Sequence, residues 1–457
     1  MSEHATIKSI HFTGVFGHQE LRADFKPRLN LLHGKNGSGK TTVLHILANL
    51  LQGDLIRFCN IRFERLRFGL STGQVLLLEQ PADQPGVVGV SLDGTTLGQL
   101  SQAAPVGPEI ALEFARLFPK RPVYLPAFRS ILEAASDREE YGGPYRDSPD
   151  LRREIASIRA LEERFLKDKR LPRSPSAHDT INSTALKTLL SRRWFGKFVP
   201  VIRYPSLADV SRRLDDEFET AYITVNITNQ DTFATVFSKV LQAVQHDGEP
   251  DSNEGVAVLL RRVQQQLQAL RPGQTQPADV ASQTWLGNEE KSVRRILAIY
   301  DKALTLRKTK EDEAYKGLRL FEASFNKFVT PKTLRLIRGN LGPRGPRIQI
   351  TESHSEPLDV LSSGERQVLT MLFCATHMSD DDGTMLIDEP EISLHIDWQR
   401  IIISEIMAQA GDRQVIVCTH APEVVAEHRD SLVELRSQIW SGTTQEEVDT
   451  EGGGDLF

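Results

Sequence analysis

The sequence of 457 residues has few cysteines, no long apolar run and no excess of basic residues. Its three cysteines show no CxxC spacing, which excludes a disulfide framework or a zinc site and predicts small buried residues. No run of about 18 apolar residues is available to span a membrane, and the first eight residues are too polar for a signal peptide. We therefore expect a cytoplasmic protein that does not contact a membrane. The length predicts more than one domain.

Net charge excludes a protein that is basic throughout, because the formal value at pH 7 is −6. Charge is nevertheless uneven, since residues 1–129 carry 14 Lys and Arg against 10 Asp and Glu. Arg57, Arg62, Arg65 and Arg67 cluster at and just before FCNIRFERLRF, which alternates like a strand. Such a row is either a solvated strand face or a contact for DNA or an acidic partner. The sequence leaves both interpretations open.

A glycine-rich loop follows the predicted strand 29–33 and precedes a helical pattern that begins after Lys40. The loop GKNGSGKTT consists of Gly34, Lys35, Asn36, Gly37, Ser38, Gly39, Lys40, Thr41 and Thr42. Strand, loop and helix in this order are the context of a phosphate-binding loop, whose backbone N–H groups surround the phosphates of ATP. We expect Lys40 to reach the β- and γ-phosphate oxygens and the hydroxyl of Thr41 to bind Mg²⁺.

Two acidic residues and a histidine end apolar strands near the other end of the chain. Asp388 and Glu389 follow TMLI, and His420 follows VIVCT. A carboxylate at the first position can hold Mg²⁺ through water, and one at the second can polarise the attacking water. The sequence therefore predicts Asp388 as a metal residue, Glu389 as the catalytic residue and His420 as a contact of the γ-phosphate.

The segment LSSGERQ places a helix start about 25 residues before these acids. Its candidate binding residues are Ser362, Ser363, Gly364 and Glu365. A helix N-terminus offers free N–H groups and the positive end of the helix dipole to a phosphate. A plain N-cap accounts for the helix equally well, but it leaves the position of the motif ahead of the acidic strand unexplained.

Secondary-structure patterns predict an α/β protein, with a mixed sheet that carries the phosphate loop and antiparallel N-terminal strands, interrupted by a large helical insertion. We expect an N-terminal ATPase lobe at 1–130, the insertion at 131–330, a C-terminal ATPase lobe at 331–437 and a disordered acidic tail at 438–457. The expected helices of the insertion are 151–169, 185–198, 207–219, 233–245, 255–270 and 289–328. Heptad spacing is not sustained over enough turns to predict a long coiled coil.

The motifs GKNGSGKTT, LSSGERQ, LIDEP, EISLH and VCTH, in this order, resemble those of the ABC-type ATPase head of SMC/Rad50-like and OLD-family proteins. The resemblance covers residues 1–130 and 331–437. It implies a homodimer or higher homo-oligomer in which two heads enclose two ATP molecules. Ser362, Ser363 and Gly364 would then contact the γ-phosphate bound by the partner, Glu389 would be the catalytic base, and 393–395 would form the loop between the two sites.

DEPEISLHIDWQ and YLPAFR are similar to segments of the stand-alone ATPases of the PARIS and Septu anti-phage systems. This resemblance implies a separate effector, a Toprim-like or HNH nuclease, and a phage protein as trigger. The 37 residues after His420 are too few for a nuclease domain. One departure is the absence of a glutamine after PVYLPAFRS, and Arg129 is the candidate replacement for it.

The leading hypothesis is therefore a slow, Mg²⁺-dependent ATPase without nuclease activity of its own, acting as the sensor or scaffold of a defence complex. A Rad50-like DNA-binding repair ATPase is the alternative, although a zinc hook is absent. A transporter subunit fits poorly, because the helical insertion is too large.

Overall fold

The computed structural model describes residues 5–35, 37–129, 132, 148–163, 175–245, 254–270, 288–337, 345–351, 354–376 and 382–440. The chain forms two compact units. The first contains residues 1–210 and 359–457, and the second contains residues 211–358. The predicted domain limits differ from this division, because the helices at 149–163 and 175–195 belong to the first unit.

A parallel sheet is the centre of the first unit. Its strands are β14 (Leu432–Glu434), β3 (Leu29–His33), β13 (Val415–Cys418), β12 (Asp382–Asp388) and β8 (Arg121–Leu125), in this spatial order. The central strands β3 and β13 are apolar and largely buried, as expected for a sheet covered on both faces, whereas the edge strand β14 is partly exposed. All pairings in this sheet are parallel, so the carboxyl ends of its strands meet at one edge.

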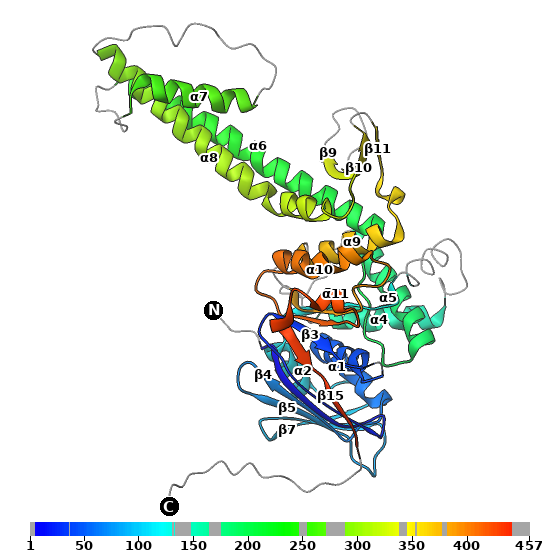
Figure 1. The fold of residues 1–457 in the computed structure, drawn as a ribbon. Helices are drawn as coiled ribbons and strands as arrows, with labels where there is room; N and C mark the ends of the chain where they lie inside the picture. Colours follow the sequence, from blue (N-terminus) through cyan, green and yellow to red (C-terminus); the bar gives the residue numbers. More distant parts are fainter. Residues whose placement is uncertain are drawn as a thin grey trace, which may run out of the picture. The chain divides into compact units, whose positions relative to one another are not determined.

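The second sheet of this unit is antiparallel, with the order β15-β2-β1-β4-β5-β6-β7. Its strands are β1 (Ile7–Val15), β2 (Gln19–Asp24), β4 (Arg65–Leu70), β5 (Val75–Glu79), β6 (Val87–Leu92), β7 (Thr95–Ser101) and β15 (Arg436–Ile439). Buried and accessible residues alternate along β4 and β5, as expected for a sheet with one face on a core. Figure 1 shows β15, in red, against the blue N-terminal strands. Neither β7 nor β15 is predicted by the sequence.

Helices complete the first unit. They are α1 (Lys40–Gln52), η1 (Leu55–Asn60), α2 (Pro108–Leu117), α4 (Pro149–Glu163), α5 (Pro175–Phe195), α9 (Ser363–Thr376), α10 (Ile396–Gln409), α11 (Pro422–Val425) and η4 (Arg429–Ser431). The short helix η3 (Leu358–Val360) spans the limit between the units. Of the four arginines grouped near the predicted strand, Arg57 lies outside it, in η1, where it pairs with Asp54 at 3.0 Å. All three cysteines are buried and free, as predicted.

Three helices and a small sheet form the second unit. The helices are α6 (Leu207–Gln245, which begins in the first unit), α7 (Val256–Leu270) and α8 (Asn288–Phe325), and the strands are β9 (Thr333–Ile337), β10 (Gly345–Thr351) and β11 (His354–Glu356). α6 and α8 run antiparallel, since Phe218 contacts Tyr315 and Asn229 accepts from Arg307. The two helices predicted at 207–219 and 233–245 are one helix, since α6 is continuous through the residues between them.

Both helices of this antiparallel pair are long, with 39 and 38 residues. α7 packs on α8 through an ion pair of 2.9 Å between Arg262 and Asp301. None of the helices in the described part of the chain is long and apolar enough to cross a bilayer. The mixed α/β fold class with a helical region is confirmed.

Candidate functional site

The glycine-rich loop connects β3 to α1, as the sequence predicts. Gly37 and Gly39 have φ angles of 77° and 92°, which residues with a Cβ rarely adopt. Gly39 is the N-cap of α1, and Thr41 and Thr42 lie in the first turn. The Oγ atom of Ser38 is buried and has no hydrogen-bond partner in the described structure. An unsatisfied hydroxyl beside a helix N-terminus is a feature that a phosphate would satisfy. Asn36 lies outside the described residues.

Lys40 extends across this loop. Its Nζ donates to the carbonyl oxygens of Gly34 at 2.7 Å and Lys35 at 3.1 Å, and it lies 3.5 Å from Nδ1 of His420. Burial lowers the pKa of Lys40, while nearby acidic residues such as Glu389 oppose that shift. The ammonium group is therefore held at the loop by carbonyl oxygens, at the position where a phosphate would accept from it.

Asp388 ends β12 directly opposite the first turn of α1. The hydroxyl of Thr41 donates to its Oδ1 at 3.3 Å. Burial raises the pKa of Asp388 to about 7, and the hydrogen bond from Thr41 acts in the opposite direction. A hydroxyl and a carboxylate oxygen in contact fit Mg²⁺, which takes oxygen ligands and keeps several waters. When bound, the metal would neutralise phosphate charge, and Thr41 and Asp388 would hold it.

Glu389 follows in a left-handed conformation with a φ of 46°. Its N–H donates to the carbonyl of Cys418 at 2.8 Å, so the backbone after β12 is tied to the end of β13. Its Oε1 lies 3.7 Å from Nε2 of His420. A hollow of about 640 Å³ is lined by Gly37, Thr41, Glu389, Glu391, His420 and Ala421. Residues from both ends of the chain thus surround one space, because parallel strands place their carboxyl ends together.

Strand register explains this convergence. Cys418 on β13 pairs with Asp388 on one side and with Leu32 on the other. The segments that follow these three residues are the acidic loop, the histidine loop and the phosphate loop. They therefore leave the sheet at the same level.

Arg129 lies beneath the acidic loop and is fully buried. Its guanidinium donates to the carbonyl oxygens of Asp388 at 3.2 Å, Glu389 at 3.3 Å and Pro390 at 3.3 Å. It also donates to Oε1 of Gln367 in α9 at 3.2 Å. Arg129 thus fixes the backbone of the acidic loop relative to α9. Its suggested role in place of the family's glutamine stays a prediction.

The predicted signature segment forms a capping box at the start of α9. The N–H of Ser362 donates to Oε2 of Glu365 at 2.7 Å, and the N–H of Glu365 donates to Oγ of Ser362 at 3.3 Å. Ser362 and Ser363 are exposed, whereas Gly364 is buried. None of the four predicted signature residues is among the described residues that line the hollow. The capping interpretation is therefore confirmed, and the exposed serines remain available to another molecule.

Glu391 belongs to the site but was not identified from the sequence. Its Oε1 accepts from Oγ1 of Thr419 at 2.9 Å, from the N–H of His420 at 2.8 Å and from the N–H of Ala421 at 3.2 Å. The only signal in the sequence is a third carboxylate immediately after the Asp-Glu-Pro motif.

Comparison with known protein families is consistent with this geometry. Residues 287–426 match the family described as "AAA domain, putative AbiEii toxin, Type IV TA system", and residues 9–84 match the family described as "AAA domain". The first match contains the signature, the acidic strand and His420, and the second contains the phosphate loop. Together they support a P-loop ATPase with an AAA domain. No curated protein matches the sequence.

Solved structures similar to this chain include head domains of Smc proteins. One is the Smc head domain with an extended coiled coil bound to the C-terminal domain of ScpA, from Pyrococcus furiosus. It is 14% identical to this chain, and the comparison has a TM-score of 0.40 and covers 95% of this chain and 96% of that chain. Another, the Smc head domain with a coiled coil and joint from Pyrococcus yayanosii, is 13% identical, with a TM-score of 0.35 and coverage of 95% and 97%.

Proposed function

We propose that this chain is a Mg²⁺-dependent, ABC-type ATPase that hydrolyses ATP slowly. The observation that carries the proposal is the convergence of Lys40, the Thr41–Asp388 pair and the Glu389–His420 pair around one hollow. Lys40 binds phosphate oxygens, and Thr41 with Asp388 holds Mg²⁺. Glu389 accepts a proton from the attacking water. His420 donates to the γ-phosphate.

Two chains complete each site in this proposal. Ser362 and Ser363 are exposed at the N-terminus of α9 and do not line the chain's own hollow, which supports a role on the nucleotide of a partner. An isologous pair of heads would then contain two composite sites. The helical insertion contributes further contacts in higher homo-oligomers.

The biological setting that we infer is anti-phage defence, with this chain as sensor or scaffold. The family that matches residues 287–426 carries a toxin–antitoxin description, which supports a two-component system. In this proposal the ATPase holds a separate effector, a Toprim-like or HNH nuclease, and releases it when a phage protein is detected. The chain itself has no nuclease activity.

The test of the ATPase proposal is the variant Glu389→Gln. It keeps the shape of the side chain but cannot accept the proton, so hydrolysis should fall by about 100-fold or more. ATP should then remain bound and shift the protein to a dimer in size-exclusion chromatography with light scattering. Lys40→Ala in the same background is the control, since it should bind no ATP and stay at its original size. An ATP-independent elution profile of Glu389→Gln would contradict the paired-head proposal.

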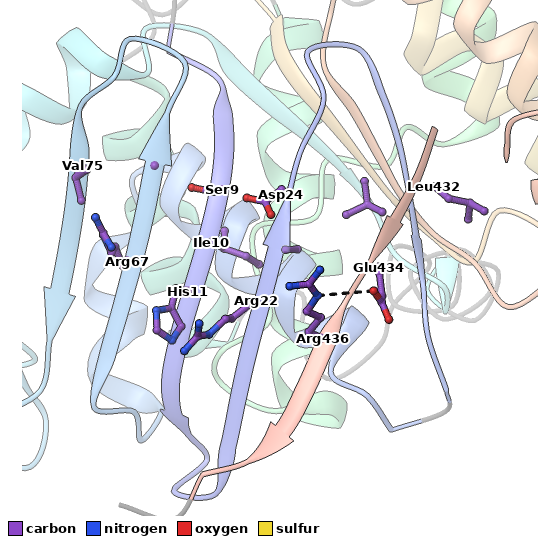
Figure 2. Close-up of a pocket in the computed structure, with 13 residues that line it drawn as sticks. Ser9, Ile10, His11, Arg22, Asp24, Arg67, Val75, Leu432, Glu434 and Arg436 are labelled. Carbon is purple, nitrogen blue, oxygen red and sulfur yellow. Dashed lines mark ion pairs between the residues drawn. The ribbon is translucent and has the colours of Figure 1, made fainter. Parts of the chain in front are cut away.

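A second candidate function, a Rad50-like ATPase that contacts DNA, is favoured by one surface. Arg436, Arg22, His11 and Arg67 occupy paired positions on β15, β2, β1 and β4. Figure 2 shows these side chains along the hollow of about 460 Å³ that they help to line. Arg22 is paired with Glu20 and Arg436 with Glu434, and the remaining arginine of the row, Arg67, can contact a phosphodiester backbone. The carboxylates of Asp24 and Glu434 also line the hollow and reduce its positive charge.

DNA-stimulated ATPase activity separates this candidate from the first. Arg67 forms no ion pair within the described part of the chain, so Arg67→Glu should abolish stimulation by duplex DNA at low salt. Arg65→Glu on the same strand is the matched control, because Arg65 is already paired with Glu79 at 2.8 Å. Equal ATPase rates with and without DNA in the wild type would remove the Rad50-like candidate.

A further inference from the structure

Glu391 connects two loops that are separated by 28 residues in the sequence. One oxygen of its carboxylate accepts three hydrogen bonds, from the Thr419 hydroxyl and from the N–H groups of His420 and Ala421. Hydrogen bonds to an ionised carboxylate are among the stronger ones in proteins. They fix the backbone on both sides of the His420 side chain.

The position of the His420 ring follows from this anchoring. The ring lies between Lys40, at 3.5 Å from Nδ1, and Glu389, at 3.7 Å from Nε2. Glu391 lines the same hollow. In the described structure it forms no hydrogen bond to the side chain of Lys40 or Glu389. Its second oxygen is buried and has no hydrogen-bond partner among the described residues. Glu391 therefore acts on the site by holding the histidine loop in place.

The backbone of Glu391 begins the turn that supports the signature helix. The N–H of Leu394 donates to the carbonyl of Glu391 at 3.0 Å, and Ser393 within the turn has a φ of 64°. The carbonyl oxygen of Ser393 packs directly against Gly364, since a Cβ atom at position 364 would lie 2.6 Å from it. A displacement of the turn would therefore move the start of α9.

We infer that Glu391 is a positioning residue that couples His420 to the signature helix. A change at the histidine loop, such as contact of His420 with a γ-phosphate, reaches the 391–394 turn through the three hydrogen bonds. The turn transmits it to Gly364 and hence to the exposed Ser362 and Ser363. The chain's own nucleotide site thereby controls the half-site that it presents to its partner. This inference rests on the proposed ATPase function.

Three variants of the full-length protein test the inference. Glu391→Ala removes the acceptor, Glu391→Gln retains an oxygen acceptor of the same length, and Glu427→Ala is the control at an exposed glutamate in the segment that follows the histidine loop. We expect Glu391→Ala to lower kcat by ~10-fold or more and to change the Kd for ATP by less than about 3-fold. Glu391→Gln and Glu427→Ala should stay within about 3-fold of the wild-type kcat.

Dimer formation gives a second readout. In a Glu389→Gln background, Glu391→Ala should abolish the ATP-dependent size shift and Glu391→Gln should preserve it, with thermal unfolding measured for each variant. A wild-type kcat and a full size shift in Glu391→Ala would overturn the inference. A loss of kcat and of the size shift in Glu391→Gln equal to that in Glu391→Ala, at an unchanged Tm, would also overturn it, because the hydrogen-bond acceptor would then not matter. If the wild type neither hydrolyses ATP nor dimerises, the proposed function itself fails.

Discussion

Gly364 illustrates how a single small residue constrains this site. It lies in the first turn of α9, where the carbonyl oxygen of Ser393 would be 2.6 Å from an added Cβ atom and the ring of Trp398 would be 3.4 Å away. The oxygen belongs to backbone, so it cannot move aside as a flexible side chain can. The absence of a side chain at 364 thus allows the signature helix to pack on the turn that follows the acidic loop.

We predict that Gly364→Ala separates the start of α9 from the turn that contains Ser393. Overpacking of this kind costs about 1–3 kcal/mol, so the Tm should fall, and ATPase activity should fall by about 10-fold while ATP binding is retained. Isothermal calorimetry and a phosphate-release assay measure the two effects. Gly317→Ala in α8 is the control, because an added Cβ there meets no atom within 4 Å. It should stabilise the helix slightly. Unchanged activity in Gly364→Ala would contradict the importance of this contact.

At the scale of elements, α1 is held on the parallel sheet by both apolar and polar contacts. Ten of its thirteen residues are buried, including Asn49 and Gln52, which bond to the segment after α5. His45 contributes a hydrogen bond of 2.9 Å between its Nε2 and the hydroxyl of Tyr124 in β8. Burial lowers the pKa of His45 to about 4, so the ring is neutral in the folded protein at neutral pH.

His45 should make the protein less stable in acid. Its pKa is about 4 in the folded state and about 6.5 in the unfolded state, so between these values the unfolded chain binds the proton more readily. The free energy of unfolding therefore decreases as pH falls from 6.5 to 4, by on the order of 2 kcal/mol. Asp388 acts in the opposite direction, because its raised pKa favours the folded state below pH 7.

Comparison of the wild type with His45→Gln isolates the histidine contribution. In chemical denaturation, the change in the free energy of unfolding between pH 7.5 and pH 5 should be more favourable to the folded state in the variant than in the wild type, because the destabilising contribution of His45 is removed while the stabilising contribution of Asp388 remains. Identical pH dependence of the two proteins would mean that His45 is protonated as easily in the folded as in the unfolded chain.

At the scale of the whole molecule, the proposed nucleotide site is formed by segments that are more than 300 residues apart in the sequence. The phosphate loop follows β3, and Glu389 and His420 follow β12 and β13, which lie beside it in one sheet. The exposed Ser362 and Ser363 are supplied by the same chain but do not line this hollow. In the proposed function, one chain therefore carries two different half-sites.

Mixing two inactive variants should restore activity if each half-site needs a partner. Lys40→Ala destroys the phosphate loop but keeps the signature, and Ser363→Arg blocks the exposed signature but keeps the loop. A mixed dimer contains one intact composite site, so the mixture should hydrolyse ATP at a rate that neither variant shows alone. Each variant measured alone at the same total concentration is the control. No recovery over a range of ratios would favour sites that are complete within one chain.

Local motifs of this protein could be predicted because each depends on one short segment. The glycine-rich loop needs positive φ angles at Gly37 and Gly39 and a following helix, and both requirements are visible in the sequence. The acidic strand and the α/β fold class followed from apolar runs that end in polar residues. The short edge strand β15 could not be found, since its four residues are all exposed and carry no alternating pattern.

The long helix α6 was divided in error for a related reason. Its middle is rich in β-branched and polar residues, which have low intrinsic helix propensity. In the structure, hydroxyl groups of Thr220, Thr224 and Thr228 donate within the helix, and the pairing with α8 stabilises it. Tertiary packing overrides propensity here.

The sequence alone determined which chemical groups are present: a glycine-rich loop between a strand and a helix, and an aspartate, a glutamate and a histidine at strand ends. Only the tertiary structure decided how they are connected. Glu391 reaches the histidine loop, Arg129 holds the acidic loop, and Gly364 admits the Ser393 carbonyl, through contacts between residues 28 to 260 positions apart. Such contacts depend on strand register and helix packing, which arise from the burial of the whole core and leave no periodic pattern in any one segment.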